Sequence, residues 1–375
     1  MSSRALCAML GVALLSGVFV VGGTPSSAAP PDASEIALTA YQRMTPRERL
    51  GQLFISGVTT AGPRRAESRA LRRIAAGNVY LREASDASVR TVAARVRGID
   101  HARSYARVHP FVGTDQEGGL VQRLTGHGFD RMPSALAQGR MRPARLETLA
   151  RRWGRQLHRA GVTMDLAPVA DVVPARGARH NQPIGRHQRE FAHRPGRAGR
   201  HVAAFTRGLA AAGVAATLKH FPGLGRASGN TDDTRRVTDP TGPHDPYLRS
   251  FQDGIGAGAD FVMVSSAIYP RIDRANRACF SPTVMSLLRD RLGFDGVIVS
   301  DSFGAASLAG TSLGQRAVRF FRAGGTMILD STPGHLAAMA GAVRDRMRTH
   351  PGFRTRIRDA VLLVLETKAA RGLIA

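Results

Sequence analysis

Short apolar runs recur along the whole chain, and their number and spacing constrain the fold more than any other feature. Helical stretches such as residues 144–161 and 195–213 separate most of these runs, and several end in glycine just before the next run, as a helix stop should. The runs have the composition of buried parallel strands. They lie at residues 53–57, 78–82, 111–115, 163–171, 215–221, 261–266, 296–301 and 326–330. Eight strands alternating with helices predict an α/β fold, a (β/α)₈ TIM-type barrel.

An open, doubly wound parallel sheet is the alternative architecture for such alternation. The sequence gives it little support, because no G-x-G-x-x-G motif follows the first predicted strand. The longest irregular regions, residues 116–142, 172–194 and 222–245, follow the third, fourth and fifth predicted strands. Long loops at the carboxyl ends of barrel strands are where sites are built, so we expect the site there.

The first 29 residues have the pattern of a secretory signal peptide. Arg4 is followed by an apolar core and then by a stretch of small residues that ends near Ala28. A transmembrane anchor is the alternative, but the apolar run is at the short end for spanning a bilayer. We expect cleavage to leave residues 30–375 as one domain with closing helices, secreted or extracytoplasmic and without a stable membrane anchor. Cys279 would then be the sole remaining cysteine.

The charge of the chain is extreme and comes almost wholly from arginine. The sequence holds 51 arginines and two lysines, and its formal net charge is +25. Nucleic-acid binding is one interpretation of such a charge. The basic residues are spread along the chain rather than gathered in an arm, however, and aromatic residues make up only 6% of it, which is few for stacking on bases. We therefore favour an exported protein that works against anionic envelope polymers and binds no specific nucleic acid.

Charged residues stand at the ends of most predicted strands, where an unpaired charge is costly to bury. Because strand ends meet at the mouth of a barrel, these side chains predict a polar site there. The residues are Asp115, Asp171, Lys219 with His220, Asp301 and Asp330. Separate local salt bridges that each cap one strand are the alternative. No metal-binding cluster and no nucleotide loop appears in the sequence, so we expect neither a metal nor a cofactor.

Individual positions in this set allow more than one chemistry. Lys219 could form a Schiff base with a carbonyl substrate or act as a fixed donor to hydroxyl groups. Asp301 is predicted at a strand-to-helix turn, where a helix N-terminus would favour its carboxylate, although a simple N-cap is the alternative. Arg123 is expected to return toward the mouth, and Glu117 could pair with an arginine at the rim.

Six segments, taken in order, carry a resemblance to a known family. They are "GTDQEGGLVQRL", "DLAPVADV", "NQPIGRHQREF", "KHFPGLG", "VMVSSAIYP" and "GFDGVIVSD", within residues 40–335. The set resembles glycoside hydrolase family 3, and within it the single-barrel bacterial β-N-acetylhexosaminidases. The resemblance implies a single catalytic (β/α)₈ domain and a retaining mechanism that passes through a covalent glycosyl-enzyme. It also implies a carbohydrate substrate, with terminal β-N-acetylglucosaminides of cell-wall glycan, including peptidoglycan fragments, as the first expectation.

Carried over by motif, the resemblance assigns roles to residues of this chain. The nucleophile matches Asp301. Substrate-binding roles match Asp115, Arg123, Lys219, His220 and Arg189. The resemblance thus favours Lys219 as a donor to sugar hydroxyls over a Schiff-base lysine, and a compact ammonium suits that role better than a broad guanidinium.

The sequence departs from the family pattern in the loop that follows the fifth predicted strand. The resemblance implies an Asp-x-His dyad there whose histidine is the general acid/base, but Asn230 and Asp232 stand at those positions. Leu224 replaces a second histidine of the loop, and Leu120 replaces an arginine usual after "DQEGG". One hypothesis makes Asp232, or its neighbour Asp233, the proton donor, with a pKa raised by its surroundings.

Two further hypotheses remain for the missing histidine. A histidine from another segment could take its place. The candidates are His127, His180 and His187. Otherwise the acid is absent, and the protein binds glycans on the same scaffold with little or no turnover.

Overall fold

The computed structural model describes residues 32–103 and 107–375. The predicted signal peptide lies outside these residues. The described chain from Asp32 to Ala375 forms one compact unit.

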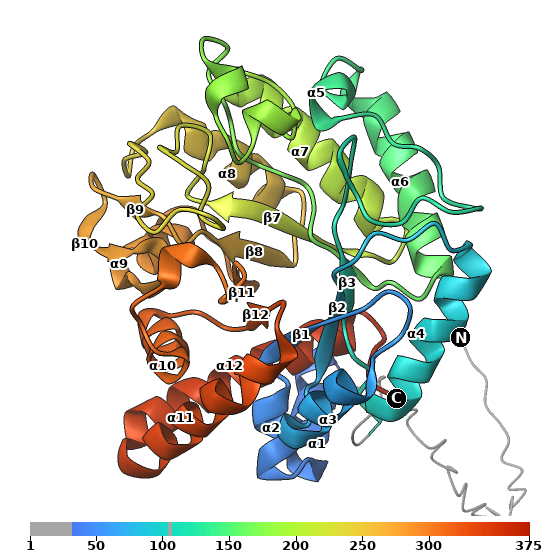
Figure 1. The fold of residues 1–375 in the computed structure, drawn as a ribbon, viewed down its shortest axis with the longest axis vertical. Helices are drawn as coiled ribbons and strands as arrows, with labels where there is room; N and C mark the ends of the chain where they lie inside the picture. Colours follow the sequence, from blue (N-terminus) through green and yellow to red (C-terminus); the bar gives the residue numbers. More distant parts are fainter. Residues whose placement is uncertain (1–31, 104–106) are drawn as a thin grey trace, which may run out of the picture. The chain divides into compact units, whose positions relative to one another are not determined.

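Eight parallel strands form the central sheet, in the order β11-β8-β7-β6-β3-β2-β1-β12, so that strands consecutive in the sequence are neighbours (Figure 1). Val299 on β11 makes a parallel bridge to Met327, the residue just before β12, which brings the two end strands together. The strands are β1 (Phe54–Val58), β2 (Asn78–Leu81), β3 (Val112–Thr114), β6 (Met164–Asp165), β7 (Ala215–Phe221), β8 (Phe261–Val264), β11 (Val297–Ser300) and β12 (Ile328–Asp330). The barrel prediction is confirmed, and this strand order rules out the doubly wound sheet.

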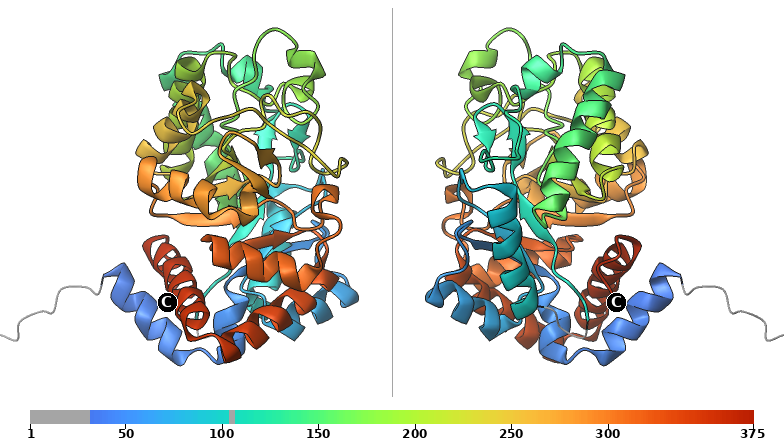
Figure 2. Two further views of the ribbon diagram at one scale, coloured as in Figure 1. Left: turned by 90° about the vertical axis from the view of Figure 1, so that its left-hand side faces the viewer. Right: turned by 90° about the vertical axis from the view of Figure 1, so that its right-hand side faces the viewer.

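Helices surround the strands, and local sequence signals set several of their ends. They are α1 (Ala33–Arg43), α2 (Pro46–Gly51), α3 (Arg65–Ile74), α4 (Val89–Arg103), α5 (Ala135–Gln138), α6 (Pro143–Arg159), α7 (Pro195–Ala210), α8 (Arg249–Gly256), α9 (Pro282–Ser286), α10 (Leu313–Ala323), α11 (Leu336–Thr349) and α12 (Pro351–Ala370). Thr45 and Glu48 form a capping box at the start of α2, and Pro195 begins α7. The first and last helices, α1 and α12, lie side by side (Figure 2).

Short additional elements lie in the long loops at the carboxyl ends of the strands. Two small antiparallel sheets pair β4 (Gln116–Gly118) with β5 (Val121–Gln122), and β9 (Ile268–Tyr269) with β10 (Asp273–Arg277). No helix in the described part of the chain is both long and apolar enough to cross a membrane.

Both lysines are buried inside the barrel, at opposite ends of it. Lys219 is on β7, close to the carboxyl ends of the strands. Lys368 reaches from α12 to the amino-terminal end, where its Nζ donates to Gln52 Oε1 at 2.7 Å and to the Gly77 carbonyl at 3.1 Å. At both positions the broader guanidinium of an arginine would displace the neighbouring residues.

The structure corrects two predictions of local structure. The fourth strand was expected over residues 163–171 but spans Met164–Asp165, because Pro168 has no N–H to donate to the ladder. Asp301 was expected at a helix N-terminus, but the next α-helix, α10, begins at Leu313 behind the N-cap Ser312. The carboxylate of Asp301 therefore has no helix dipole beside it.

Candidate active site

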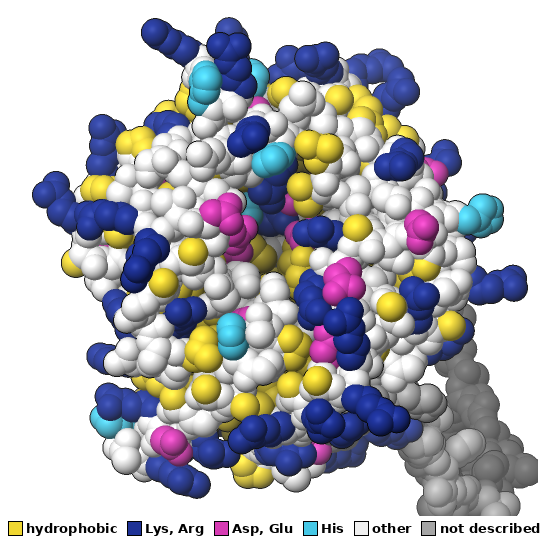
Figure 3. Space-filling model, viewed as in Figure 1, with side chains coloured by type: hydrophobic (Ala, Val, Ile, Leu, Met, Phe, Trp, Pro, Cys, Tyr) yellow, Lys and Arg dark blue, Asp and Glu magenta, His cyan; other side chains and the backbone are white. Residues whose placement is uncertain are grey.

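A pocket of about 460 Å³ opens at the carboxyl ends of the barrel strands. Figure 3 shows the hollow near the centre of this face, with acidic and basic side chains at its edge. Its charged and titratable lining residues are Tyr80, Asp115, Arg123, Arg189, Lys219, His220, Asp232 and Asp301. Every residue to which the sequence assigned a catalytic or sugar-binding role thus lines one cavity.

Lys219 lies between two carboxylates at the floor of this pocket. Its Nζ is 2.6 Å from Asp115 Oδ1 and 2.6 Å from Glu117 Oε1, and its side chain is 3% exposed. Burial alone would raise the pKa of Asp115, but the Lys219 ammonium outweighs burial and holds that pKa below its ordinary value. Burial alone would lower the pKa of Lys219, but the negative charges of Asp115 and Glu117 outweigh burial and raise it. The structure therefore keeps a cation and an anion side by side, where each can meet sugar hydroxyls.

Arg189 reaches the pocket from the loop after β6 and pairs with Glu117. Its Nε and Nη2 donate to the two carboxylate oxygens at 2.8 Å each, and its Nη1 donates to the Pro183 carbonyl at 2.7 Å. Although burial opposes it, the charges of Arg189 and Lys219 lower the pKa of Glu117 to about 2. Glu117 is thus the buried anion that holds both cations in place.

Arg123 lies at the edge of the pocket, half-buried. Its Nε is 3.9 Å from Asp115 Oδ2, and its backbone N–H donates to the Asp115 carbonyl at 3.1 Å across the β4–β5 turn. The guanidinium is free enough to contact a ligand, because its side chain is 38% exposed.

His220 faces the pocket beside Lys219, although neighbours on a strand usually point to opposite faces. The Lys219–His220 peptide bond is cis. His220 Nδ1 is 2.7 Å from Asp171 Oδ2, and Asp171 Oδ1 accepts the Leu224 N–H at 2.7 Å. Asp171, predicted among the charges at the mouth, instead lies behind His220 and fixes the orientation of its ring.

Asp232 and Asp301 are held together although 69 residues separate them in the chain. The loop that carries Asp232 accepts two backbone hydrogen bonds from the segment after Asp301. Ala306 N donates to the Asp232 carbonyl at 3.1 Å, and Ser307 N donates to the Thr231 carbonyl at 3.0 Å. Both carboxylates line the pocket, and the Ser302 N–H donates to Asp301 Oδ1 at 2.7 Å.

The environment of Asp232, including the charge of Asp301, alters its ionisation. Loss of solvation in the pocket and then the negative charge of Asp301 raise the pKa of Asp232 to about 6. Asp232 retains exposed surface at the rim, so solvent screens part of this effect. A carboxylic acid with a pKa near neutrality, opposite a second carboxylate, has the properties of a general acid.

The structure distinguishes among the hypotheses for the missing histidine. Asp233 does not line the pocket; its Oδ2 accepts the Asn230 side-chain amide at 2.8 Å. The three candidate histidines, His127, His180 and His187, are exposed and absent from the pocket lining. Among the residues that the structure describes, Asp232 is the carboxyl group that shares the cavity with Asp301 outside the Asp115–Lys219 cluster.

Asp330 does not join the site, contrary to the expectation for strand-end charges. Its Oδ1 accepts the Thr332 N–H at 2.7 Å, and its Oδ2 is 3.1 Å from His335 Nδ1. Asp330 caps its own loop. This agrees with the alternative in which a strand-end charge forms a separate local salt bridge.

Sequence reasoning missed two residues next to the sugar-binding cluster. Tyr80 lines the pocket and donates its hydroxyl to Asp115 Oδ2 at 2.5 Å. Asp165 lies fully buried beneath the cluster, where burial raises its pKa to about 8, and the Gln116 N–H donates to its Oδ1 at 3.0 Å. The sequence signal for Asp165 was an acidic residue inside an apolar run. Because the fourth strand is predicted to extend to residue 171, Asp171 and not Asp165 stands at its predicted end.

The described residues contain no group of three or more histidine, cysteine, aspartate or glutamate side chains arranged to hold a metal ion.

Comparison with known proteins agrees with this geometry. Residues 45–356 match the profile of the glycosyl hydrolase family 3 N terminal domain. A beta-hexosaminidase of Stenotrophomonas maltophilia (strain K279a) is 38% identical over 205 residues, which are 52% of this chain and 58% of that protein. The match therefore spans less than two thirds of that relative. A beta-hexosaminidase of Methylococcus capsulatus is 33% identical over 281 residues, 69% of this chain and 80% of the relative.

A solved structure shows the same architecture over nearly its whole length. The beta-N-acetylhexosaminidase from Beutenbergia cavernae DSM 12333 is 40% identical and superposes with a TM-score of 0.84, covering 88% of this chain and 99% of that one. Because the family profile covers most of the chain and the barrel superposes as a unit, the chain belongs to glycosyl hydrolase family 3.

Proposed function

We propose that the protein is a secreted, retaining glycosidase of the β-N-acetylhexosaminidase type, which removes terminal β-N-acetylglucosamine from cell-wall glycan. One observation carries the catalytic part of this proposal: Asp232 and Asp301 line the same sugar-sized pocket, and the pKa of Asp232 is raised to about 6, in part by Asp301. The substrate type is supported by the hexosaminidase names of the relatives.

In the first step, the Asp301 carboxylate attacks the anomeric carbon of the bound sugar. The protonated Asp232 donates its proton to the glycosidic oxygen, so that the leaving group departs as a neutral alcohol. The products of this step are a glycosyl ester on Asp301 and an ionised Asp232.

In the second step, the ionised Asp232 acts as a base. It takes a proton from a water molecule that attacks the anomeric carbon, the bond to Asp301 breaks, and both carboxyl groups return to their starting states. Two displacements at one carbon retain its stereochemistry.

The Lys219 cluster and the histidine beside it would bind the sugar hydroxyls. Asp115 accepts hydrogen bonds while Lys219, Arg123, His220 and Arg189 donate them, which fits the alternating donors and acceptors of a pyranose ring. Because Glu117 and Asp171 already hold Arg189 and His220, these donors need little reorganisation when substrate binds.

The extracytoplasmic location and the cell-wall substrate rest on different support. The signal peptide pattern of residues 1–29 and the net charge of +25 suit an exported protein that meets anionic envelope polymers. Measuring the N-terminus of the mature protein and its distribution between cell fractions tests the first claim. Release of N-acetylglucosamine from purified cell-wall fragments tests the second.

A substrate assay tests the catalytic proposal. Wild type, Asp301→Ala and Asp232→Ala are compared on a 4-methylumbelliferyl β-N-acetylglucosaminide, the matching β-glucoside and a β-linked N-acetylglucosamine disaccharide. We expect Asp301→Ala to lose all three activities. Asp232→Ala should lose the disaccharide activity far more than the aryl activity, because an activated leaving group needs little protonation.

Asp233→Ala is the matched control, since Asp233 neighbours Asp232 without lining the pocket. Equal loss of both activities in Asp232→Ala would remove Asp232 as the acid. A wild type that binds N-acetylglucosamine without turning over any substrate would leave the glycan-binding alternative in its place.

A further inference from the structure

A second cavity, larger than the candidate active site, lies at the other end of the barrel. It has a volume of about 690 Å³, within the range of small-molecule sites. We call it the basal groove, and it is lined by Thr45, Pro46, Arg47, Leu50, Arg73, Ile74, Ala337, Ala340, Gly341, Arg344, Met347, Arg348 and Arg354. These residues come from α2 and the end of α3, which precede β1 and β2, and from α11 and α12. A ligand here would not compete with one at the mouth.

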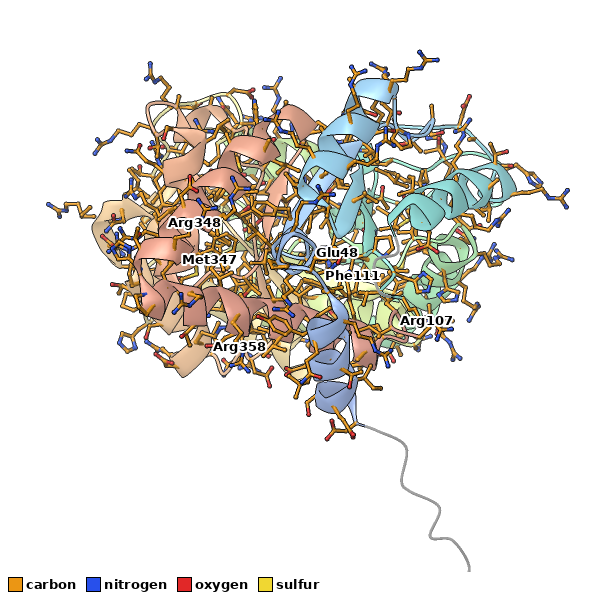
Figure 4. The ribbon with its side chains drawn as sticks, turned by 90° about the horizontal axis from the view of Figure 1, so that it is seen from below. Glu48, Arg107, Phe111, Met347, Arg348 and Arg358 are labelled. Atoms are coloured by element: carbon orange, nitrogen blue, oxygen red, sulfur yellow. The ribbon has the colours of Figure 1, made fainter. Side chains whose placement is uncertain are left out.

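The floor of the basal groove is apolar. Ile74 and Ala340 are buried, and Leu50, Ala337 and Met347 are half-buried and pack against the core. Figure 4 labels Met347 on α11 in a view from below the barrel. α11 packs directly against α2 and α3, so these side chains form one continuous surface.

The rim of the groove is strongly cationic. Five of the lining residues are arginines, and none is acidic. Within the described chain, the guanidinium groups of Arg47, Arg73 and Arg354 make no hydrogen bond or ion pair. Arg344 and Arg348 share one exposed carboxylate, that of Asp345, at 3.9 and 3.7 Å, a contact that water screens.

The nearest acid on α2, Glu48, is already engaged. Its Oε2 accepts the Thr45 N–H at 2.8 Å in the capping box of that helix, and it does not line the groove. The guanidinium groups of the rim therefore have spare donors, and in the described chain the exposed carboxylate of Asp345 is the one counter-charge within ion-pair distance of them.

We propose that the basal groove binds a single-chain anionic amphiphile, with its alkyl chain on the apolar floor and its phosphate or carboxylate head on the arginine rim. The charge of the rim selects the anionic head, because guanidinium forks bind phosphate and carboxylate oxygens. The floor selects the chain, and each buried methylene adds roughly fourfold to affinity. The floor residues are buried or half-buried whereas the five arginines are exposed, which favours a monomeric ligand over the flat surface of a bilayer.

Gly341 provides a variant that blocks the groove without disturbing the fold. A Cβ built at Gly341 meets no heavy atom within 4 Å, so a larger side chain has room to extend into the groove. Leucine also favours a helix over glycine. Gly98 on α4 is the matched control, because it too lies within a helix, is exposed, has no atom within 4 Å of its Cβ position, and is absent from the groove.

The probe is dodecyl phosphate below its micellar concentration, titrated into the full-length protein by calorimetry. We expect binding to wild type and to Gly98→Leu, and at least a tenfold loss in Gly341→Leu. The pair Arg73→Gln with Arg344→Gln should weaken binding by on the order of fivefold per arginine. The same charge change at Arg151 and Arg155, exposed residues of α6 outside the groove, should leave binding unchanged.

Several results would overturn the proposal. Inorganic phosphate or dodecyl maltoside binding as tightly as dodecyl phosphate would show that head and chain are not both recognised. Undiminished binding in Gly341→Leu would place the ligand elsewhere. Binding to phosphatidylglycerol vesicles but not to the monomeric probe would make this face a membrane-contact surface instead.

Discussion

The electrostatic link between Asp232 and Asp301 can be tested directly by removing one charge. In Asp301→Asn the carboxylate that contributes to the raised pKa of Asp232 becomes a neutral amide of nearly the same shape. Loss of solvation, the largest cause of the shift, remains. The pKa of Asp232 should therefore fall from about 6 part of the way toward the ordinary 3.8, by less than about two units.

The measurement is a ¹³C NMR titration of aspartate carboxyl carbons, with the Asp232 signal assigned by its absence in Asp232→Asn. Asp345→Asn is the control, because it removes one negative charge from an exposed position on α11, remote from the pocket. Water in the empty pocket should reduce the shift, so we expect a higher pKa of Asp232 when a sugar is bound.

The same ionisation should appear in the kinetics of wild type. With a pKa near 6, about half of Asp232 is protonated at pH 6 and about a tenth at pH 7. Hydrolysis of the disaccharide should fall accordingly on the alkaline side, while aryl substrates depend on pH less steeply. An unchanged pKa of Asp232 in Asp301→Asn would refute the claim that the charge of Asp301 raises that pKa.

Two further predictions concern the buried lysines. Lys219→Met leaves the carboxylates of Asp115 and Glu117 without their shared cation, so we expect a loss of roughly 3–5 kcal/mol in the free energy of unfolding by urea at pH 7. Adding Asp115→Asn should recover part of it, and an unchanged urea midpoint in the single variant would contradict the pairing. The pKa of Lys368 is lowered well below its ordinary value by burial, so the unfolded chain binds one proton more than the native one between that pKa and about 10.4. The free energy of unfolding of wild type, relative to that of Lys368→Met, should thus rise by up to about 1.36 kcal/mol per pH unit in that window. If this difference in free energy does not depend on pH, the buried amine of Lys368 stays charged beside Gln52.

The positions of the strands were predictable because they depend on local sequence. Seven of the eight apolar runs coincide with strands to within two residues at each end. The exception was the fourth run, where Pro168 interrupts a segment whose hydrophobicity is continuous. Helices α6 and α7 lie where the glycine stops and amphipathic stretches indicated.

The membership of the site was only partly predictable. Asp115, Lys219 and Asp301 were expected at one mouth because parallel strands end there, and they line one pocket. Arg189 was placed by resemblance alone, and Glu117 was expected to pair with an arginine at the rim without the sequence indicating which one. The choice among Asp232, Asp233 and three histidines could not be made from loop sequence, because turn residues carry no information about which strand ends they will face.

The sequence by itself determined the eight barrel strands, their order and the alternation with helices, since these follow from hydrophobic periodicity and capping over a few neighbouring positions. Tertiary structure alone decided which carboxyl group lies opposite Asp301, how acidic Asp232 is, and which charges pair with Lys219. Ionisation and pairing depend on burial and on distances between segments many residues apart, and those are fixed only when the barrel closes.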